Sequence, residues 1–345
     1  MATAISPHPR LNCLRAQPWR LTLGAPDELA VGCNPDRFLP VVDPHGHAMA
    51  YSLGCAVEAA ASIADVEWTP GDQSDMNRPD YVAGTLRIHG LKQHGLALEQ
   101  ALLETRCTNR YPFFATPVND EVGERLAALA SELGVTARLR QPNRRTLKRL
   151  TATGASRWFQ QQAYVEELLD HFRVSPDEAS LDARGMTADG LALGWWQKST
   201  MKLLRDHNRT RAVAKALGGA RAMAASASAY VERSGGFVLI TARDATPRGR
   251  IQAGRALMRV WLELTRQHLA CQPLDFPVSF AEGASRVLEL FGAEDGEYPV
   301  TLLRVGRATQ APATRSTRLS PPEFCRLERP PASERALARP RGNLR

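Results

Sequence analysis

The residues best suited to chemistry form the segment Arg106–Phe113, which reads Arg-Cys-Thr-Asn-Arg-Tyr-Pro-Phe and is expected at the mouth of a helix. Arg106 and Arg110 alternate with the hydroxyl of Thr108. An arginine guanidinium offers a phosphate a rigid fork of donors, and a threonine adds one more. A helix start contributes unpaired N–H groups and the positive end of its dipole. The spacing predicts that the three side chains converge on one phosphate, each charged hydrogen bond contributing roughly 1.5–3 kcal/mol.

Each of these residues also has a purely structural interpretation. Arg106 and Arg110 could lie at an ordinary solvated helix entrance, and Thr108 could cap a helix. A second element, Gln17-Pro18-Trp19, lies far upstream. Its tryptophan could simply belong to the core, as a lone tryptophan often does.

Length and composition predict a packed globular protein. The 345 residues suffice for one large or two ordinary domains, and 43% of them are apolar. No apolar run approaches the ~20 residues of a membrane span, and the first residues hold prolines and arginines instead of a signal-peptide apolar block. We therefore expect a soluble, cytoplasmic protein without a membrane partner.

The net charge of +8 raises the question of a nucleic-acid partner. Residues 329–345 hold five arginines and one glutamate, so five minus one leaves +4 in a Pro-rich tail that we expect to be disordered. A second basic cluster has no acid between Glu132 and Glu166 and comprises Arg138, Arg140, Arg144, Arg145, Lys148, Arg149 and Arg157. It could contact phosphates, but no known nucleic-acid module accompanies it, which favours a solvated basic connector.

Neither the cysteines nor the histidines indicate a metal site. The six cysteines are scattered without a Cys-x-x-Cys pair, which favours reduced, buried thiols. His45 and His47 flank Gly46, but the sequence suggests no third ligand. No metal is expected.

Apolar periodicity predicts mixed helices and strands. Helices are expected over 47–64, 96–105, 118–133, 157–172, 206–217 and 248–268, and strands over 19–23, 29–31, 81–88, 136–139, 237–241 and 300–305. Residues 70–79 are expected as a loop and 315–324 as an extended arm. The Gly-x-Gly-x-x-Gly and Walker patterns and the regular βαβ rhythm of a Rossmann domain are absent from the sequence, so the class is α+β.

Several segments resemble one family when they are taken in order. Gln17-Pro18-Trp19 comes first, then residues 34–44 before an Ala-rich helix, and then Arg106, Thr108 and Arg110. Ala253-Gly254-Arg255-Ala256-Leu257, Leu303-Arg304-Val305-Gly306 and the basic pair Arg315 and Arg318 follow. This order resembles the FMN-dependent nitroreductases. More narrowly, it is similar to the Acg-like branch, in which two nitroreductase-like halves are joined in one polypeptide.

The resemblance implies a nitroreductase-like fold with mixed central sheets flanked by helices, arranged as a single-chain pseudo-dimer. Residues 1–103 would form the ring-side wall of the flavin site, 104–328 the larger half with the phosphate grip, and 329–345 the tail. Arg106, Thr108, Arg110, Arg315 and Arg318 would hold the phosphate end of one FMN per chain, and Gln17, Pro18 and Trp19 would lie near its ring. The chain would be a monomer, as a pseudo-dimer, or a homodimer.

Two function classes follow from the resemblance. The first is an oxidoreductase in which FMN accepts hydride from NADPH or NADH and passes electrons to a nitroaromatic, quinone or similar acceptor. The second is a non-catalytic protein that stores or sequesters FMN. A protein without FMN affinity would instead be an interaction module, for which the 138–157 cluster offers a nucleic-acid surface.

Some residues depart from the family pattern or stay open. Leu11, Asn12, Cys13 and Arg15 stand where the family has small residues and an asparagine. A cation at Arg15 could favour the anionic reduced flavin or block the site. Trp195 and Trp196 could stack on a ring or form a lid, but interior packing is the expected arrangement. The sequence identifies no catalytic acid, base or nucleophile.

Overall fold

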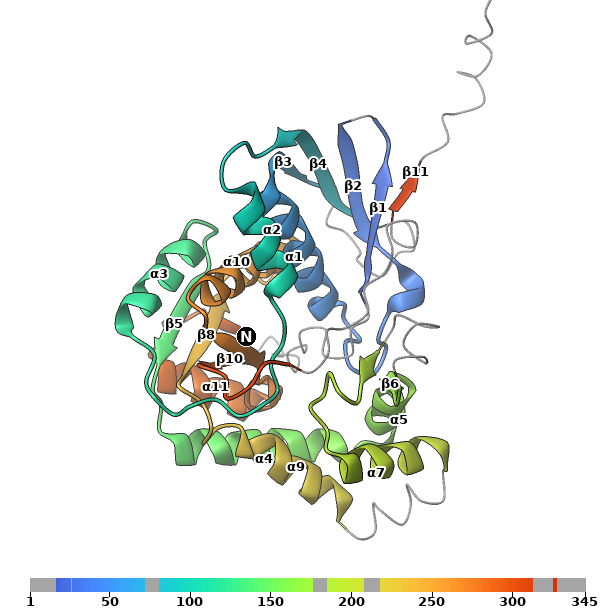
Figure 1. Ribbon diagram of the computed structural model, residues 1–345, viewed down its shortest axis with the longest axis vertical. Coiled ribbons are helices and arrows are strands. Elements are labelled where there is room, and N and C mark those ends of the chain that lie inside the picture. Colours follow the sequence, from blue (N-terminus) through green and yellow to red (C-terminus); the bar gives the residue numbers. More distant parts are fainter. Residues whose placement is uncertain are drawn as a thin grey trace, which may run out of the picture.

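Two sheets stand on either side of a pair of long helices in this computed structural model (Figure 1). The structure describes residues 17–25, 27–71, 81–175, 185–207, 218–312 and 325–327. Helices and strands mix without a repeating βαβ order, and the strand pairs of the two main sheets are antiparallel except for one. The α+β class predicted from the sequence is confirmed.

The first sheet has the strand order β11-β1-β2-β4-β3. Its strands are β1 (Trp19–Leu23), β2 (Glu28–Cys33), β3 (Ala64–Pro70), β4 (Val82–Leu91) and β11 (Cys325–Leu327). Strand β11 pairs in parallel with β1, so residues near the end of the chain complete the sheet that its first residues begin (Figure 1). Sequence reasoning missed β3 and β11.

Helix α1 (His47–Ile63) covers one face of this sheet. Met49, Leu53 and Val57 recur every four residues and pack against Val31 and Leu86. This four-residue step places the three side chains on one helix face. The prediction of an Ala-rich helix at 47–64 is correct to within one residue.

The second sheet has the order β5-β8-β10-β9 and is antiparallel throughout. Its strands are β5 (Thr136–Arg140), β8 (Gly236–Ala242), β9 (Ala270–Pro273) and β10 (Tyr298–Gly306). Every residue of β8 is buried, as its continuous apolar sequence predicted. Val238 and Ile240 face helix α10 (Pro247–Arg266), whereas Phe237 and Leu239 face α4 (Arg144–Phe159) and α11 (Ala281–Phe291).

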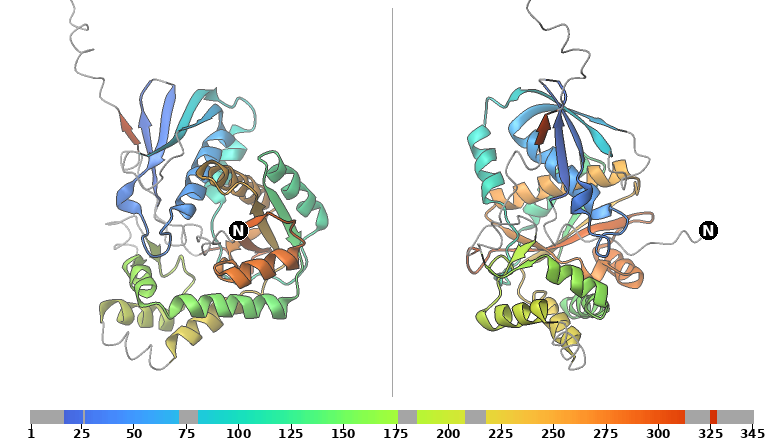
Figure 2. Two further views of the ribbon diagram at one scale, coloured as in Figure 1. Left: turned by 180° about the vertical axis from the view of Figure 1, so that it is seen from behind. Right: turned by 90° about the vertical axis from the view of Figure 1, so that its right-hand side faces the viewer.

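Helices α1 and α10 cross between the two sheets at a pair of glycines (Figure 2). A Cβ on Gly54 would lie 2.0 Å from the Ile251 carbonyl oxygen, and one on Gly254 would lie 2.1 Å from that of Tyr51. Cys55 donates from Sγ to the Gly254 oxygen at 3.2 Å. The crossing therefore requires glycine on both helices.

The remaining elements surround this centre. They are η1 (Pro35–Arg37), α2 (Leu96–Thr105), α3 (Asp120–Ser131), α5 (Gln162–Asp170), β6 (Phe172–Arg173), β7 (Met186–Thr187), α7 (Trp195–Asp206), α9 (Gly219–Ala229) and η2 (Phe276–Val278). The single helix expected over 157–172 is wrong, because α4 ends at Phe159 and α5 begins at Gln162. The loop after Gly71, most of the 206–217 helix, the 315–324 arm and the 329–345 tail lie outside the described residues.

The basic cluster at 138–157 is not a connector. It lies in β5 and α4, and several of its charges are paired. Arg138 forms a buried ion pair with Glu297 at 2.7 Å, and Lys148 pairs with Glu232 at 2.7 Å. These contacts give the cluster a structural role.

Candidate functional site

The segment Arg106–Phe113 follows a helix instead of beginning one. Helix α2 ends at Thr105, Arg106 N donates to the Leu102 oxygen at 2.8 Å, and the next helix begins only at Asp120. The expected helix mouth is therefore wrong. Because the carboxyl end of a helix carries the negative end of its dipole, anion binding here would have to come from the side chains.

The side chain of Arg304 on strand β10 holds the 106–113 loop through hydrogen bonds to its backbone. This arginine is 0% exposed, and its Nη2 donates to the carbonyl oxygens of Asn109 and Tyr111 at 3.2 and 2.8 Å. Its Nε donates to Gln272 at 2.7 Å, and its guanidinium lies 3.8 Å from the Phe113 ring centroid. Strand β10 thus fixes the backbone on both sides of Arg110.

Arg304 has no carboxylate partner among the residues that the structure describes. Burial, together with the neighbouring charge of Arg110, lowers its pKa to about 10. Its acceptors are neutral oxygens, which satisfy the donors but do not neutralise the charge. Within the described ranges the charge of Arg304 is therefore not neutralised, which favours an anion nearby.

Arg106 adds to this charge. Its guanidinium carbon lies 4.7 Å from the ring centroid of Trp261 on α10, and its Nε is buried without a hydrogen-bond acceptor in the described part of the chain. The thiols of Cys55 and Cys271 lie nearby, and burial raises the pKa of both, that of Cys55 to about 12. These neutral thiols do not compensate the arginine.

The other two residues of the predicted grip have different neighbours. Thr108 forms a parallel bridge with Cys271 of β9. Arg110 donates from Nη1 to the Gly190 oxygen at 2.8 Å, and its Nη2 lies 3.7 Å from Met186 Sδ. Arg106 thus packs against α10, whereas Arg110 contacts the 186–190 segment. Their convergence on one phosphate stays a prediction.

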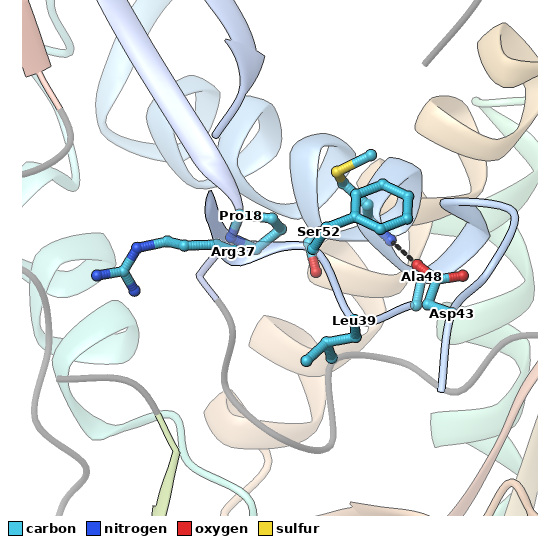
Figure 3. Close-up of a pocket in the computed structure, with 8 residues that line it drawn as sticks. Pro18, Arg37, Leu39, Asp43, Ala48 and Ser52 are labelled. Carbon is cyan, nitrogen blue, oxygen red and sulfur yellow. Dashed lines mark hydrogen bonds between the residues drawn. The ribbon is translucent and has the colours of Figure 1, made fainter. Parts of the chain in front are cut away.

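Gln17, Pro18 and Trp19 lead into the first sheet. Gln17 is 2% exposed and has a left-handed backbone, φ +48°, which is uncommon for a residue other than glycine. Trp19 begins β1 and packs against the core of the first sheet, as its structural interpretation required. Pro18 lines a small pocket with Arg37, Phe38, Leu39, Asp43, Ala48, Met49 and Ser52 (Figure 3).

This pocket encloses about 10 Å³, which is room for about one water molecule. Asp43 closes one side of it, and Arg37 points away (Figure 3). Asp43 Oδ2 accepts from Met49 N at 2.9 Å, while Oδ1 is buried without a hydrogen-bond partner among the described residues. Burial raises the pKa of Asp43 to about 6.

Contacts through the 186–190 segment link the two predicted ends of the site. Leu39 lines the Pro18 pocket and belongs to the same apolar cluster as Met186, which Arg110 contacts. The carboxylate of Glu167 on α5 also accepts from Val41 N and Val42 N at 3.1 and 2.7 Å. The fold therefore joins Gln17-Pro18-Trp19 to the arginine segment through one shared group of side chains.

Other predicted residues fall elsewhere. Arg15, Arg315 and Arg318 lie outside the described residues. Interior packing of Trp195 and Trp196 is wrong, since they are 66% and 69% exposed. Sequence reasoning missed Arg304 and Asp43 as site residues. The signal for Arg304 was a lone arginine within the apolar strand Val-Thr-Leu-Leu-Arg-Val.

Two further features of the described residues concern metals and membranes. No group of three or more His, Cys, Asp or Glu side chains that could hold a metal ion occurs in the described ranges. No helix within these ranges is both long and apolar enough to cross a membrane.

Comparison with known proteins gives matches only among solved structures. No protein-family model and no curated protein matches the chain. The FMN-dependent nitroreductase NfnB from Mycobacterium smegmatis, in complex with NADPH, is 16% identical with a TM-score of 0.40, over 67% of this chain and 97% of that one. A nitroreductase with bound FMN from Desulfitobacterium hafniense is 12% identical with a TM-score of 0.38, over 65% and 94%.

The NADPH:FMN oxidoreductase from Vibrio harveyi, complexed with NAD⁺, is 14% identical with a TM-score of 0.35, over 64% of this chain and 73% of that one. At these identities and TM-scores the matches leave the chemistry of the site open.

Proposed function

We propose that this chain binds FMN and moves electrons from NADPH or NADH to a nitroaromatic, quinone or similar small acceptor. The observation that carries the proposal is the positive charge of Arg304 and Arg106 beside the 106–113 loop, for which the described residues provide no carboxylate. Arg304 is buried without a carboxylate, and Arg106 has a buried donor without an acceptor in the described part of the chain. A phosphate dianion would supply both the charge and the acceptor.

The arginine and threonine side chains beside the loop are of the types that bind a flavin phosphate. Arg106, Thr108 and Arg110 would hold the phosphate end, with Arg315 and Arg318 as further candidates from beyond the described ranges. Gln17, Pro18 and Trp19 would lie near the ring. When bound, the flavin supplies hydride acceptance and electron transfer, and the protein supplies binding, orientation and exclusion of water.

We also propose that the chain is a fused pair of halves, 1–103 and 104–328, followed by the tail 329–345. Two observations support this arrangement. Each sheet is covered by its own long helix, and these helices, α1 and α10, meet at Gly54 and Gly254. The crossing packs the first sheet and its helix against the second sheet and its helix, as the interface of a dimer would. We propose one flavin per chain, and a cytoplasmic protein that is a monomer or a homodimer without a nucleic-acid partner.

The visible spectrum of the purified full-length protein tests flavin binding, and addition of NADPH or NADH tests electron transfer. We expect a yellow protein that bleaches with the donor and recovers its colour when a quinone is added. A colourless protein with no measurable FMN affinity would refute the proposal.

Arg106→Ala tests the phosphate grip. We expect the FMN dissociation constant to rise by roughly ten- to a hundredfold, because one charged hydrogen bond contributes roughly 1.5–3 kcal/mol. Arg286→Ala is the control, since Arg286 is 54% exposed and pairs with Glu289 on α11. Unchanged FMN retention in Arg106→Ala would show that the grip is misassigned.

The alternative is a non-catalytic protein that stores or sequesters FMN. This alternative also predicts a yellow protein. It differs in that neither NADPH nor NADH would bleach the flavin.

A further inference from the structure

Two tryptophans that the proposed function does not use are exposed at the start of helix α7. Trp195 and Trp196 are 66% and 69% exposed, and their rings stack on each other with centroids 3.7 Å apart. Tryptophan is usually largely buried in a folded protein. A stacked exposed pair forms an apolar surface of the kind that marks an interaction site.

The apolar surface that begins at this tryptophan pair extends along the outward face of α7. Met201 is buried against Leu169 and Phe172, which fixes the inward face of α7. Leu203 follows Trp196 by seven residues, or two turns, so the two side chains lie on the same side. Leu203 is 48% exposed. The outward face thus carries an apolar stripe from the tryptophan pair to Leu203.

Basic side chains accompany this stripe. Lys202 is exposed two turns after Trp195, and Lys198 is half-buried one turn after it. Neither lysine has an ion pair within the described ranges. Asp206 at the end of α7 pairs with Arg205 at 2.9 Å and does not neutralise them. Arg221 is exposed on the adjacent helix α9, whose Met223 packs in the Met201 cluster.

We propose that this face of α7, defined by Trp195, Trp196, Lys202 and Leu203, binds an anionic membrane surface. Tryptophan rings favour the boundary between lipid headgroups and acyl chains, and lysines extend toward anionic headgroups while their stems stay in apolar contact. A surface helix with an apolar stripe and basic flanks is the usual form of such a site. Helix α7 lies at the edge of the molecule (Figures 1 and 2).

Other partners fit less well. A single-stranded nucleic acid would stack its bases on free aromatic faces, and the stacking of the two indoles on each other leaves only one such face on each ring. The buried centre of a protein interface is depleted in lysine, whereas Lys202 lies on the same side of α7 as Trp195, two turns along. The expectation of no membrane partner came from the lack of a spanning segment. A surface-bound helix needs no span.

Sedimentation of the full-length protein with lipid vesicles tests the proposal. We expect it to pellet with vesicles of phosphatidylcholine mixed with phosphatidylglycerol, with a blue shift of tryptophan fluorescence, and to stay in solution with phosphatidylcholine alone. The double variant Trp195→Gln, Trp196→Gln should bind at least roughly tenfold more weakly. Lys202→Gln should lower binding by roughly fivefold, and added salt should have the same direction of effect.

Leu98→Gln is the matched control, because Leu98 is 55% exposed on α2, outside this face. Circular dichroism of each variant would confirm that it folds. Equal binding to both vesicle types, or unchanged binding by the double tryptophan variant, would overturn the proposal. Tryptophan-dependent binding of a single-stranded oligonucleotide, or tryptophan-dependent self-association, in place of vesicle binding would also overturn it and assign the face to that partner. Vesicle binding and the yellow colour of bound flavin are separate measurements, so failure of one proposal can be told from failure of the other.

Discussion

Replacing Asp43 by asparagine should change how the stability of this protein depends on pH. Asp43 is 5% exposed beside the start of α1, and its Oδ1 has no hydrogen-bond partner among the described residues. Burial raises its pKa from 3.8 to about 6, against the opposing effects of the backbone N–H groups of Met49, Ala48 and His47 and the charge of Arg250. The carboxylate is therefore less stable in the folded protein than in the unfolded chain.

The sign and size of the effect follow from the two pKa values. Below the unfolded value of 3.8 both states hold the proton, and Asp43 contributes no pH dependence. As the pH rises from there through about 6, the unfolded chain releases the proton first and the folded protein loses stability. A difference of about two pKa units corresponds to about 3 kcal/mol, and the loss is complete above the folded value. Asparagine cannot ionise and avoids this loss.

Urea unfolding of both proteins across the acidic and neutral pH range measures the effect. The stability of Asp43→Asn relative to the natural protein should rise by about 3 kcal/mol from below the unfolded pKa to above the folded one. Asp65→Asn, which removes an exposed carboxylate on β3, reports the effect of a surface charge alone. A stability difference that stays constant with pH, or that falls as pH rises, would refute the reasoning.

Two further substitutions test the scaffold. Arg304→Lys should lower the melting temperature, because it keeps the charge but loses the planar guanidinium that bonds the carbonyls of Asn109 and Tyr111, and each carbonyl that loses its donor costs roughly 1–3 kcal/mol; an unchanged melting temperature would show that the loop does not depend on these bonds. Gly254→Ala should destabilise by at least roughly 1–3 kcal/mol in urea unfolding, since its Cβ would lie 2.1 Å from the Tyr51 oxygen. The control Gly194→Ala, whose Cβ would meet no atom closer than 3.6 Å, should be near neutral, and equal effects of the two would contradict the tight crossing.

Strand β8 and helix α10 could be predicted from sequence, because burial there follows a local pattern. The apolar run at 237–241 and the three- and four-residue steps of Ala253, Leu257 and Trp261 need no distant information. Both elements appear within two residues of the predicted bounds. Local periodicity is sufficient where a segment packs on both sides or along one broad face.

The site could be predicted less well, because its geometry depends on contacts between distant segments. Arg106, Thr108 and Arg110 were recognised by type, and the helix expected over 96–105 correctly ends just before them, but the sequence did not indicate that Arg304, far along the chain, holds their backbone. Trp195 was expected inside because of its type. Its exposure is instead set by Met201, which faces inward on the same helix. Side-chain chemistry can be read locally, whereas its direction depends on the fold.

The positive charge beside the 106–113 loop differs from that of other buried arginine sites, because two buried glutamates of the core, Glu58 and Glu297, are matched with arginines. Glu58 accepts from two arginines of α10, and Glu297 pairs with Arg138. Arg304, equally buried, bonds only to neutral oxygens among the described residues, and the charge of Arg110 acts against it. Burying an unmatched charge costs several kcal/mol, on the order of the effect of a lost ion-pair partner. A bound anion would offset this cost, so the same contacts that position the loop also give it a physical reason to bind phosphate.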